Sequence, residues 1–267
     1  MNVRFLSSLW TNRELWWRLT EREILGRYRG SALGILWSFI TPLAMLAVYT
    51  FVFSQVFKAR WGSLEEAGPL GFAINLFAGL IVFNLFSECN NRAPSLICSN
   101  PNYVKKVIFP LETLGSVAVG NAGFHALTSL SILLVFELIA MHKVPLTVFW
   151  LPLVWLPLIL LSLAGTWILS AAGVFLRDIG QLVSVALNML MFLSPIFFPM
   201  SALPERWQPF LNLNPLAVII EQTRRVTIQG TNPQLFYIIT GTITTLIFCE
   251  ASFRLFQKSK RAFADVL

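Results

Sequence analysis

Apolar stretches separated by short polar segments occupy most of this chain. Predominantly apolar runs long enough to cross a bilayer lie near 36–57, 70–88, 113–141, 148–176, 182–203 and 235–256. A bilayer core takes about 20 apolar residues per helix. The runs lack the strict alternation of apolar and polar positions that strands of a membrane barrel show. The pattern predicts an all-α integral membrane protein with one span for each run.

The polar segment before the first run has a helical period of its own. One stripe at 100° per residue is apolar and aromatic, while arginines occupy the opposite face; the stripe consists of Leu6, Trp10, Trp17, Ile24 and Tyr28. Such a helix lies in the membrane interface. The arginines and glutamates also leave no continuous apolar centre for a cleavable signal peptide. We therefore expect residues 1–34 to form an interface helix and a gate segment.

Basic residues are distributed unevenly between alternate connections. With the amino terminus inside, the cytoplasmic set is Arg4, Arg13, Arg18, Arg22, Arg27, Arg29, Arg92, Lys105, Lys106, Arg177, Arg254, Lys258, Lys260 and Arg261. The outer set is smaller: Lys58, Arg60, Lys143, Arg206, Arg224 and Arg225. Because Lys and Arg are retained inside, both termini, including the tail 259–267, are predicted to be cytoplasmic. This distribution accounts for the net charge of +7 without nucleic-acid binding.

Residues 203–234 separate the last two runs and are broken by prolines. Pro204, Pro209, Pro215 and Pro233 stand in a stretch that also carries charge. Proline at these spacings prevents one continuous helix. We expect short re-entrant helices at the outer face.

Candidate catalytic chemistry is sparse. The three cysteines have no paired spacing and no neighbouring histidine, which argues against a disulfide or a metal site. Glu88, Glu137 and Glu250 stand near predicted helix ends, where hydration is expected, and His125 is expected to be a packing residue. No phosphate-binding loop of the GxxxxGK type is present. We predict no catalytic residue, no metal and no cofactor in this chain.

Small residues in the third run predict close helix packing. Gly115, Gly120 and Gly123 lie on a long apolar stretch, where they permit the approach of a neighbouring helix.

Two segments are more specific than hydropathy requires. The first is RYRGSALGILW at 27–37, followed by Pro42 and Leu43. The second is NPNYVKKVIFP at 100–110, where Pro101 suits a helix start and Pro110 a helix end.

At these segments the chain resembles the membrane subunit of bacterial type-2 ABC exporters for polysaccharides, which carry O-antigen, capsule or teichoic acid. The resemblance extends to Arg177, Asp178 and Ile179 in the loop after the fourth run, and to residues 193–224. It covers nearly the whole chain in order. It implies a type-2 ABC transmembrane domain over 35–258 in the bacterial inner membrane.

The resemblance also implies partners. These permeases form homodimers with two copies of a separate ATPase, which binds ATP and Mg, and they move a polyprenyl-pyrophosphate-linked glycan to the periplasm. The ATPase-coupling segment then contains Asn100, Pro101, Asn102, Tyr103, Val104, Lys105 and Lys106. Arg27, Tyr28 and Arg29 stand near the entrance for the lipid pyrophosphate, and residues 203–234 form a periplasmic gate. Membrane lipids are the remaining partner.

Aromatic rings suit a glycan path because they stack on sugars without demanding specific hydrogen bonds. Lipid-facing packing is the alternative role for such rings. The candidates are Tyr49, Phe53, Phe192, Phe197 and Phe198. The resemblance favours lipopolysaccharide O-antigen as the exported glycan, with capsule or teichoic acid as alternatives. A membrane scaffold and a transferase acting on polyprenyl-linked glycans are alternatives of another class.

Overall fold

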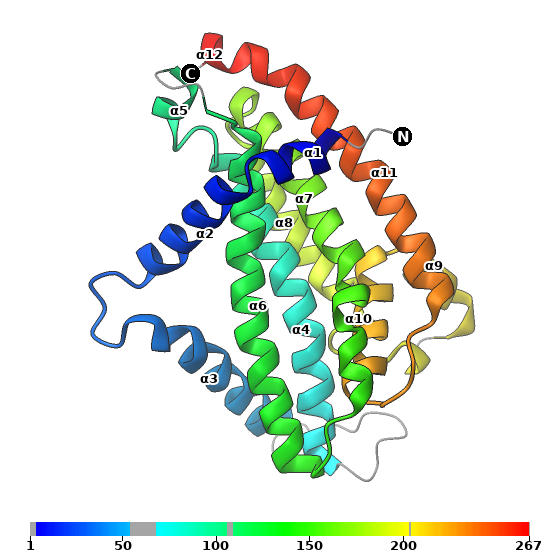
Figure 1. The fold of residues 1–267 in the computed structure, drawn as a ribbon. Helices are drawn as coiled ribbons and strands as arrows, with labels where there is room; N and C mark the ends of the chain where they lie inside the picture. Colours follow the sequence, from blue (N-terminus) through cyan, green and yellow to red (C-terminus); the bar gives the residue numbers. More distant parts are fainter. Residues whose placement is uncertain (1–3, 54–67, 106–108, 203, 267) are drawn as a thin grey trace.

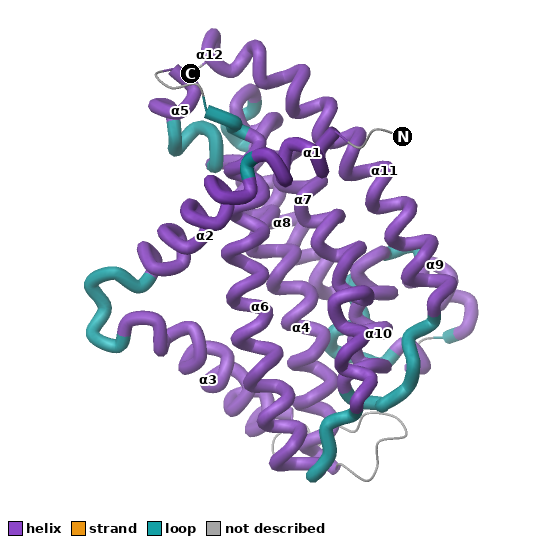
Figure 2. The backbone as a smooth tube through the Cα atoms, in the orientation of Figure 1, coloured by secondary structure: helices purple, strands orange, loops and turns teal. Residues whose placement is uncertain are grey.

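The computed structural model describes residues 4–53, 68–105, 109–202 and 204–266. All regular structure in these residues is helical (Figure 2). The bundle is built from α4 (Gly68–Arg92), α6 (Glu112–Met141), α7 (Leu151–Phe175) and α11 (Leu235–Ser259). α11 packs along α7, and α4 packs between α6 and α7. Both chain termini lie at one end of this bundle, here called the terminal end; the other end is the distal end (Figure 1).

Shorter elements connect these helices. They are α1 (Arg4–Thr11), α2 (Arg13–Arg27), η1 (Gly34–Leu36), α3 (Trp37–Phe51), η4 (Ala93–Ser95), α5 (Pro101–Lys105), η5 (Leu146–Trp150), α8 (Ile179–Phe192), η6 (Met200–Ala202), η7 (Glu205–Trp207), α9 (Gln208–Asn212), α10 (Pro215–Thr227), η8 (Lys260–Ala262) and α12 (Phe263–Val266).

Five helical stretches of the described residues are long and apolar enough to cross a membrane. They are Gly34–Phe51, Leu70–Ser95, Glu112–Met141, Leu146–Phe175 and Leu235–Val266. They correspond to five of the predicted runs, although residues 54–57 of the first run lie outside the described residues.

The predicted span at 182–203 is wrong as a continuous helix. α8 ends at Phe192, and the chain then turns through Ser194 and Pro195. Proline has no N–H for the helical ladder, which explains the break despite the apolar sequence. Ser194 stabilises this turn, because its hydroxyl donates a hydrogen bond to the carbonyl of Leu190 at 2.8 Å.

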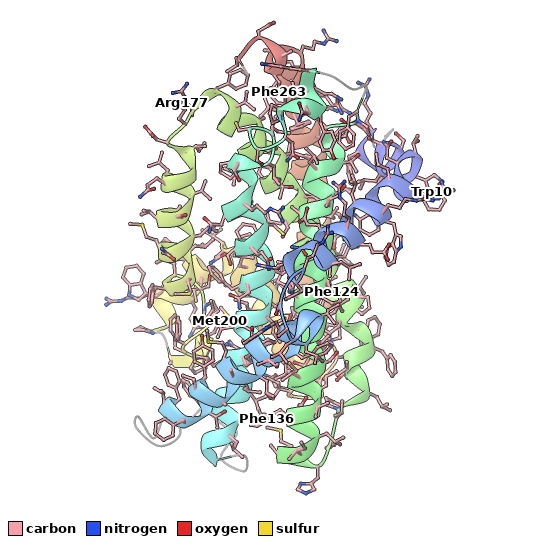
Figure 3. All side chains as sticks on the ribbon, turned by 90° about the vertical axis from the view of Figure 1, so that its left-hand side faces the viewer. Trp10, Phe124, Phe136, Arg177, Met200 and Phe263 are labelled. Carbon is pink, nitrogen blue, oxygen red and sulfur yellow. The ribbon has the colours of Figure 1, made fainter. Side chains whose placement is uncertain are left out.

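The amino-terminal segment is two helices, not one. α1 and α2 meet at Asn12, and α2 and α3 then form a V whose two arms approach α6 (Figure 1). The turn at its apex uses Gly30 and Gly34, whose φ values of 84° and 52° lie in the left-handed region that favours glycine. Trp10 projects away from the bundle (Figure 3). The predicted stripe is therefore partly on the outer face, while Phe5 and Leu19 are buried.

Two of the three predicted glycines allow close packing on α6. A side chain at Gly115 would meet Trp167 of α7 at 3.0 Å. One at Gly120 would meet Thr20 of α2 at 2.9 Å, and nothing lies within 4 Å of Gly123. Close approach of α2 also lets the Trp16 indole donate to the Ser116 carbonyl at 2.9 Å. The interface helix is thus fixed to the bundle.

Residues 204–227 form the short helices η7, α9 and α10 in place of a span. Asn214 begins α10, since its side chain accepts from the Leu216 amide at 3.0 Å and donates to Ser194 Oγ at 3.0 Å. α10 packs against α4 and α7. The end of α8 and the start of α10 are therefore joined inside the bundle.

Candidate coupling and entrance sites

The predicted coupling segment forms a short helix at the terminal end (Figure 1). α5 begins at Pro101, as the sequence predicts, and ends at Lys105; Lys106 lies outside the described residues. Asn100 precedes the helix, and its side chain donates to the Leu96 carbonyl at 2.9 Å. Pro101, Asn102 and Lys105 are exposed, whereas Val104 is half-buried.

Tyr103 faces its own protein more than the outside. Its ring stacks on Phe109 with 4.4 Å between centroids and 11° between planes. Its hydroxyl accepts a hydrogen bond from Arg22 of α2 at 3.3 Å. Tyr103 therefore links the short helix to the start of α6 and to the interface helix.

Glu112 joins both terminal segments to the first turn of α6. Its carboxylate accepts from Ser8 Oγ of α1 at 3.3 Å and pairs with Lys260 Nζ at 3.0 Å. Its backbone carbonyl accepts from the Trp167 indole at 3.0 Å. Phe263 is buried beside this end, where its ring meets Phe256 and Phe175. α12 contacts both α5 and α7.

The predicted entrance residues lie where α2 ends against α4 and α6. Arg27 Nη1 is 2.6 Å from both Glu88 Oε1 of α4 and His125 Nε2 of α6. The Tyr28 hydroxyl lies 3.4 Å from His125 Nδ1. Burial raises the pKa of this hydroxyl, a shift that Arg27 opposes, so Tyr28 stays protonated near neutral pH. Arg29 is exposed beyond the helix end.

A second ion pair reinforces this junction. Arg92 of α4 pairs with Glu23 of α2, one helical turn from the Arg27–Glu88 pair on both helices. A cleft of about 640 Å³ lies beside the two pairs, lined by Glu23, Gly26, Arg27, Glu88, Asn91, Arg92 and Asn121. The sequence predicts Glu88 to be hydrated near a helix end. The structure instead makes it the partner of Arg27 and Asn121.

Arg224 is a buried residue whose contacts the sequence does not predict. The charge pattern predicts it among the outer basic residues, and its side chain on α10 is fully buried. Its guanidinium donates to the carbonyls of Asn75 at 3.0 Å, Pro195 at 2.6 Å and Ile196 at 3.1 Å. Gly79 provides the space, since a side chain there would meet Arg224 Nη2 at 2.9 Å. Arg224 thus ties α10 to α4 and to the break after α8.

Three of the five predicted aromatic path residues pack against the core of their own chain. Phe53 stacks on Phe72 at 4.8 Å, and Tyr49 packs against the core. Phe197 packs against the core as well, and its ring stacks on the exposed Phe192 at 5.6 Å. Phe198 is half-buried. Their role in a glycan path stays a prediction.

The structure also describes the predicted positions in the loop after α7 and on α11. Arg177 and Asp178 connect α7 to α8 at the terminal end, where Arg177 is exposed (Figure 3). The Asp178 carbonyl accepts from the Gln181 amide at 3.1 Å and so starts α8. Glu250 pairs with Arg254 at 2.6 Å. No group of three or more metal-ligating side chains occurs in the described part of the chain.

Long apolar helices joined by short connections define a multi-pass membrane protein. The chain belongs to the ABC-2 type transporter family, whose model matches residues 14–228. It is therefore a transport subunit without a catalytic domain. Transporters of this family work with ATPase subunits.

Curated relatives match over nearly their full length. An O-antigen export system permease, RfbA, of Klebsiella pneumoniae is 26% identical over 93% of each chain. The RfbA permease of Myxococcus xanthus is 26% identical over 98% of this chain and 99% of its own. The polysialic acid transport protein KpsM of Escherichia coli is 26% identical over 87% of this chain and 90% of its own.

Proposed function

We propose that this protein is the channel-forming permease of an ATP-driven exporter for a polyprenyl-pyrophosphate-linked polysaccharide, with lipopolysaccharide O-antigen as the cargo. The full-length match to O-antigen export permeases carries this proposal. The arrangement of α5 and the entrance residues supports it. In this proposal two copies of the permease form the channel and two ATPase subunits bind them.

The orientation follows from the charge on the two ends of the bundle. The terminal end carries α5, the Arg177 loop and the basic residues of α11 and η8. Because basic segments stay inside, the terminal end is cytoplasmic and the distal end is periplasmic in a bacterial inner membrane. The gate proposed at 203–234 then lies on the periplasmic side.

α5 is the proposed docking element for the ATPase. Its exposed Asn102 and Lys105 offer polar contacts and positive charge, which suit an acidic cleft. Tyr103 holds the helix against Phe109 and Arg22. A displacement of α5 is thus passed to α6 and to the interface helix.

Arg27 and Arg29 are the proposed contacts for the lipid pyrophosphate. Guanidinium groups bind phosphate oxygens in bidentate fashion. Arg29 is exposed, while Arg27 is held by Glu88 and His125. An arriving pyrophosphate therefore has to compete with the Glu88 carboxylate for Arg27.

Deletion of this chain in its native host tests the function. We expect polyprenyl-linked glycan to accumulate on the cytoplasmic side and surface polysaccharide to disappear, with both effects reversed by the intact gene. Radiolabelled glycan in spheroplasts, treated with an impermeant glycosidase before and after lysis, measures the side. Glycan that is made normally and reaches the periplasm in the deletion strain would contradict the proposal. Loss of glycan synthesis itself would favour a scaffold or a transferase.

Capsule export is the second candidate, because the polysialic acid transport protein is as similar in identity as the O-antigen permeases. The identity of the polysaccharide lost in the deletion strain decides between the two cargoes.

A further inference from the structure

The half of α4 nearest the terminal end carries a polar stripe within an otherwise apolar helix. Asn84, Ser87, Glu88 and Asn91 recur at spacings of three and four and so share one face. All of them are exposed or half-exposed, although most other α4 residues are buried. Nearer the distal end the same face is apolar and buried, as at Leu80. The open polar face therefore covers only part of the helix.

α8 carries a matching stripe. Gln181, Ser184 and Asn188 share one face, and the two amides are exposed. Ser184 Oγ donates to Asn91 Oδ1 at 2.6 Å, so the two stripes meet. Leu182 and Met189, on another face of α8, are exposed and apolar.

These amides indicate contact with water. Hydrocarbon offers no hydrogen-bond partner, so an amide placed there unpaired is strongly unfavourable. Polar residues within membrane helices accordingly face the bundle interior or a water-filled cavity. The stripes also continue from the 640 Å³ cleft, which Asn91 shares with Asn121 of α6.

The charge on this surface is balanced. Glu88 is paired with Arg27, and Arg92 is paired with Glu23. The rest of the two stripes consists of amides and hydroxyls, which donate and accept hydrogen bonds as sugar hydroxyls do. A polyanion would instead be matched by arginines or lysines without acidic partners.

We propose that the α4 and α8 stripes form the wall of a water-filled vestibule, which reaches from the terminal end to the depth of Asn84 and takes an uncharged glycan. This inference rests on the proposed function and adds the charge class of the cargo. The stripe on α4 rises about 1.5 Å per residue from Asn91 to Asn84, so it spans roughly 10 Å of depth. Beyond it, the same face of α4 is apolar and buried, as at Leu80, so the proposed vestibule ends there.

Thiol labelling of the transporter in membranes tests the vestibule. Single cysteines replace Asn84 or Asn188, with Leu182→Cys and Met189→Cys as lipid-facing controls, in a background whose three native cysteines are alanine. A charged methanethiosulfonate reagent reacts with thiolates, which form in water, so we expect the stripe positions to react at least about tenfold faster than the controls. Equal rates at all four positions would overturn the vestibule.

Charge substitution tests the cargo class. Proteoliposomes holding the permease and its ATPase receive a polyprenyl-pyrophosphate-linked neutral oligosaccharide or a sialic acid polymer on the same carrier. We expect transport of the neutral glycan, with Asn84→Asp and Asn84→Lys lowering it by similar factors. Transport of the sialic acid polymer that Asn84→Lys raises and Asn84→Asp blocks would overturn the uncharged class and leave polysaccharide export intact. If the wild-type transporter hydrolyses ATP but transports neither glycan, the proposed function is overturned. The uncharged glycan proposed for the vestibule is then overturned as well.

Discussion

Arg224 shows how one side chain can hold a non-helical break inside a membrane protein. The turn after α8 leaves backbone carbonyls outside a helix, and water is not available in a bilayer core to satisfy them. The Arg224 guanidinium supplies donors to Pro195 and Ile196 and so makes the break stable. This role was not predictable from sequence, because Arg224 lies in a charged, proline-rich stretch typical of an outer loop.

Arg224→Leu should therefore destabilise the protein strongly. The two carbonyls after α8 lose these donors, and each buried acceptor left unpaired costs about 1–3 kcal/mol. Thermal unfolding of the purified protein in lipid nanodiscs measures the loss. Arg206→Gln, at an exposed position of the same segment, is the control and should leave the melting temperature unchanged. A melting temperature for Arg224→Leu equal to that of the control would show that the hydrogen bonds of Arg224 do not stabilise the fold.

Gly79→Ala gives a milder test of the same contact. The added methyl group meets Arg224 Nη2 at 2.9 Å, so the guanidinium has to shift. We expect a smaller fall in melting temperature than for Arg224→Leu. The double variant Gly79→Ala, Arg224→Leu should be no worse than Arg224→Leu alone, because its contact is already lost.

At the scale of elements, two ion pairs hold α2 against α4, and α2 supplies the base in one pair and the acid in the other. Glu23 and Arg27 on α2 meet Arg92 and Glu88 on α4. The side chains are partly exposed, so each pair contributes about 0.2–1 kcal/mol. The two pairs therefore add a modest stabilisation to the close packing of α2 on α6.

Charge reversal tests this junction. Glu23→Arg places two arginines together and should loosen α2, whereas Glu23→Arg with Arg92→Glu restores the pair. Glycan export and the rate of proteolysis between α2 and α3 are the measurements, and the double variant should recover most of the single variant's loss. No recovery in the double variant would mean that the position of α2 does not depend on this pair.

Substitutions on the packed face and on the exposed face of α5 test its proposed coupling role separately. Tyr103→Phe keeps the ring stack on Phe109 and should retain most export, whereas Tyr103→Asp removes the stack and should uncouple ATP hydrolysis from export. Lys105→Glu changes an exposed charge and should weaken co-purification with the ATPase. Tyr103→Asp that co-purifies with its ATPase and exports normally would refute the coupling role.

The sequence predicted these elements better than their contacts. Long apolar runs form spanning helices because a bilayer leaves the backbone few alternatives, and Pro101 marks the start of α5. The sequence does not reveal the end of α8, because the residues of the buried turn that follows are as apolar as those of a helix. The motif at 27–37 indicates Arg27, but its partners Glu88 and His125 lie 61 and 98 positions away in the sequence. Such pairings arise only from tertiary packing.

At the scale of the whole molecule, both ends of the chain converge on the first turn of α6. Glu112 contacts Ser8 and Lys260, which lie 104 and 148 positions away. The segment that precedes this turn contains α5. Each terminus is therefore placed to brace the region that we propose as the ATPase docking site.

The same arrangement gives a topology test. In a background without native cysteines, Lys258→Cys at the terminal end and His142→Cys after the distal end of α6 should label from opposite sides of the membrane. An impermeant maleimide applied to intact spheroplasts should reach only position 142. Labelling of both positions from the outside would contradict the proposed orientation.

The brevity of α8 has a consequence for the surrounding lipid. Its 14 residues rise about 21 Å, well short of a hydrocarbon core of about 30 Å. A bilayer adapts to a short apolar helix by thinning locally. The bilayer should therefore be thinner beside α8 than beside the longer helices of the bundle.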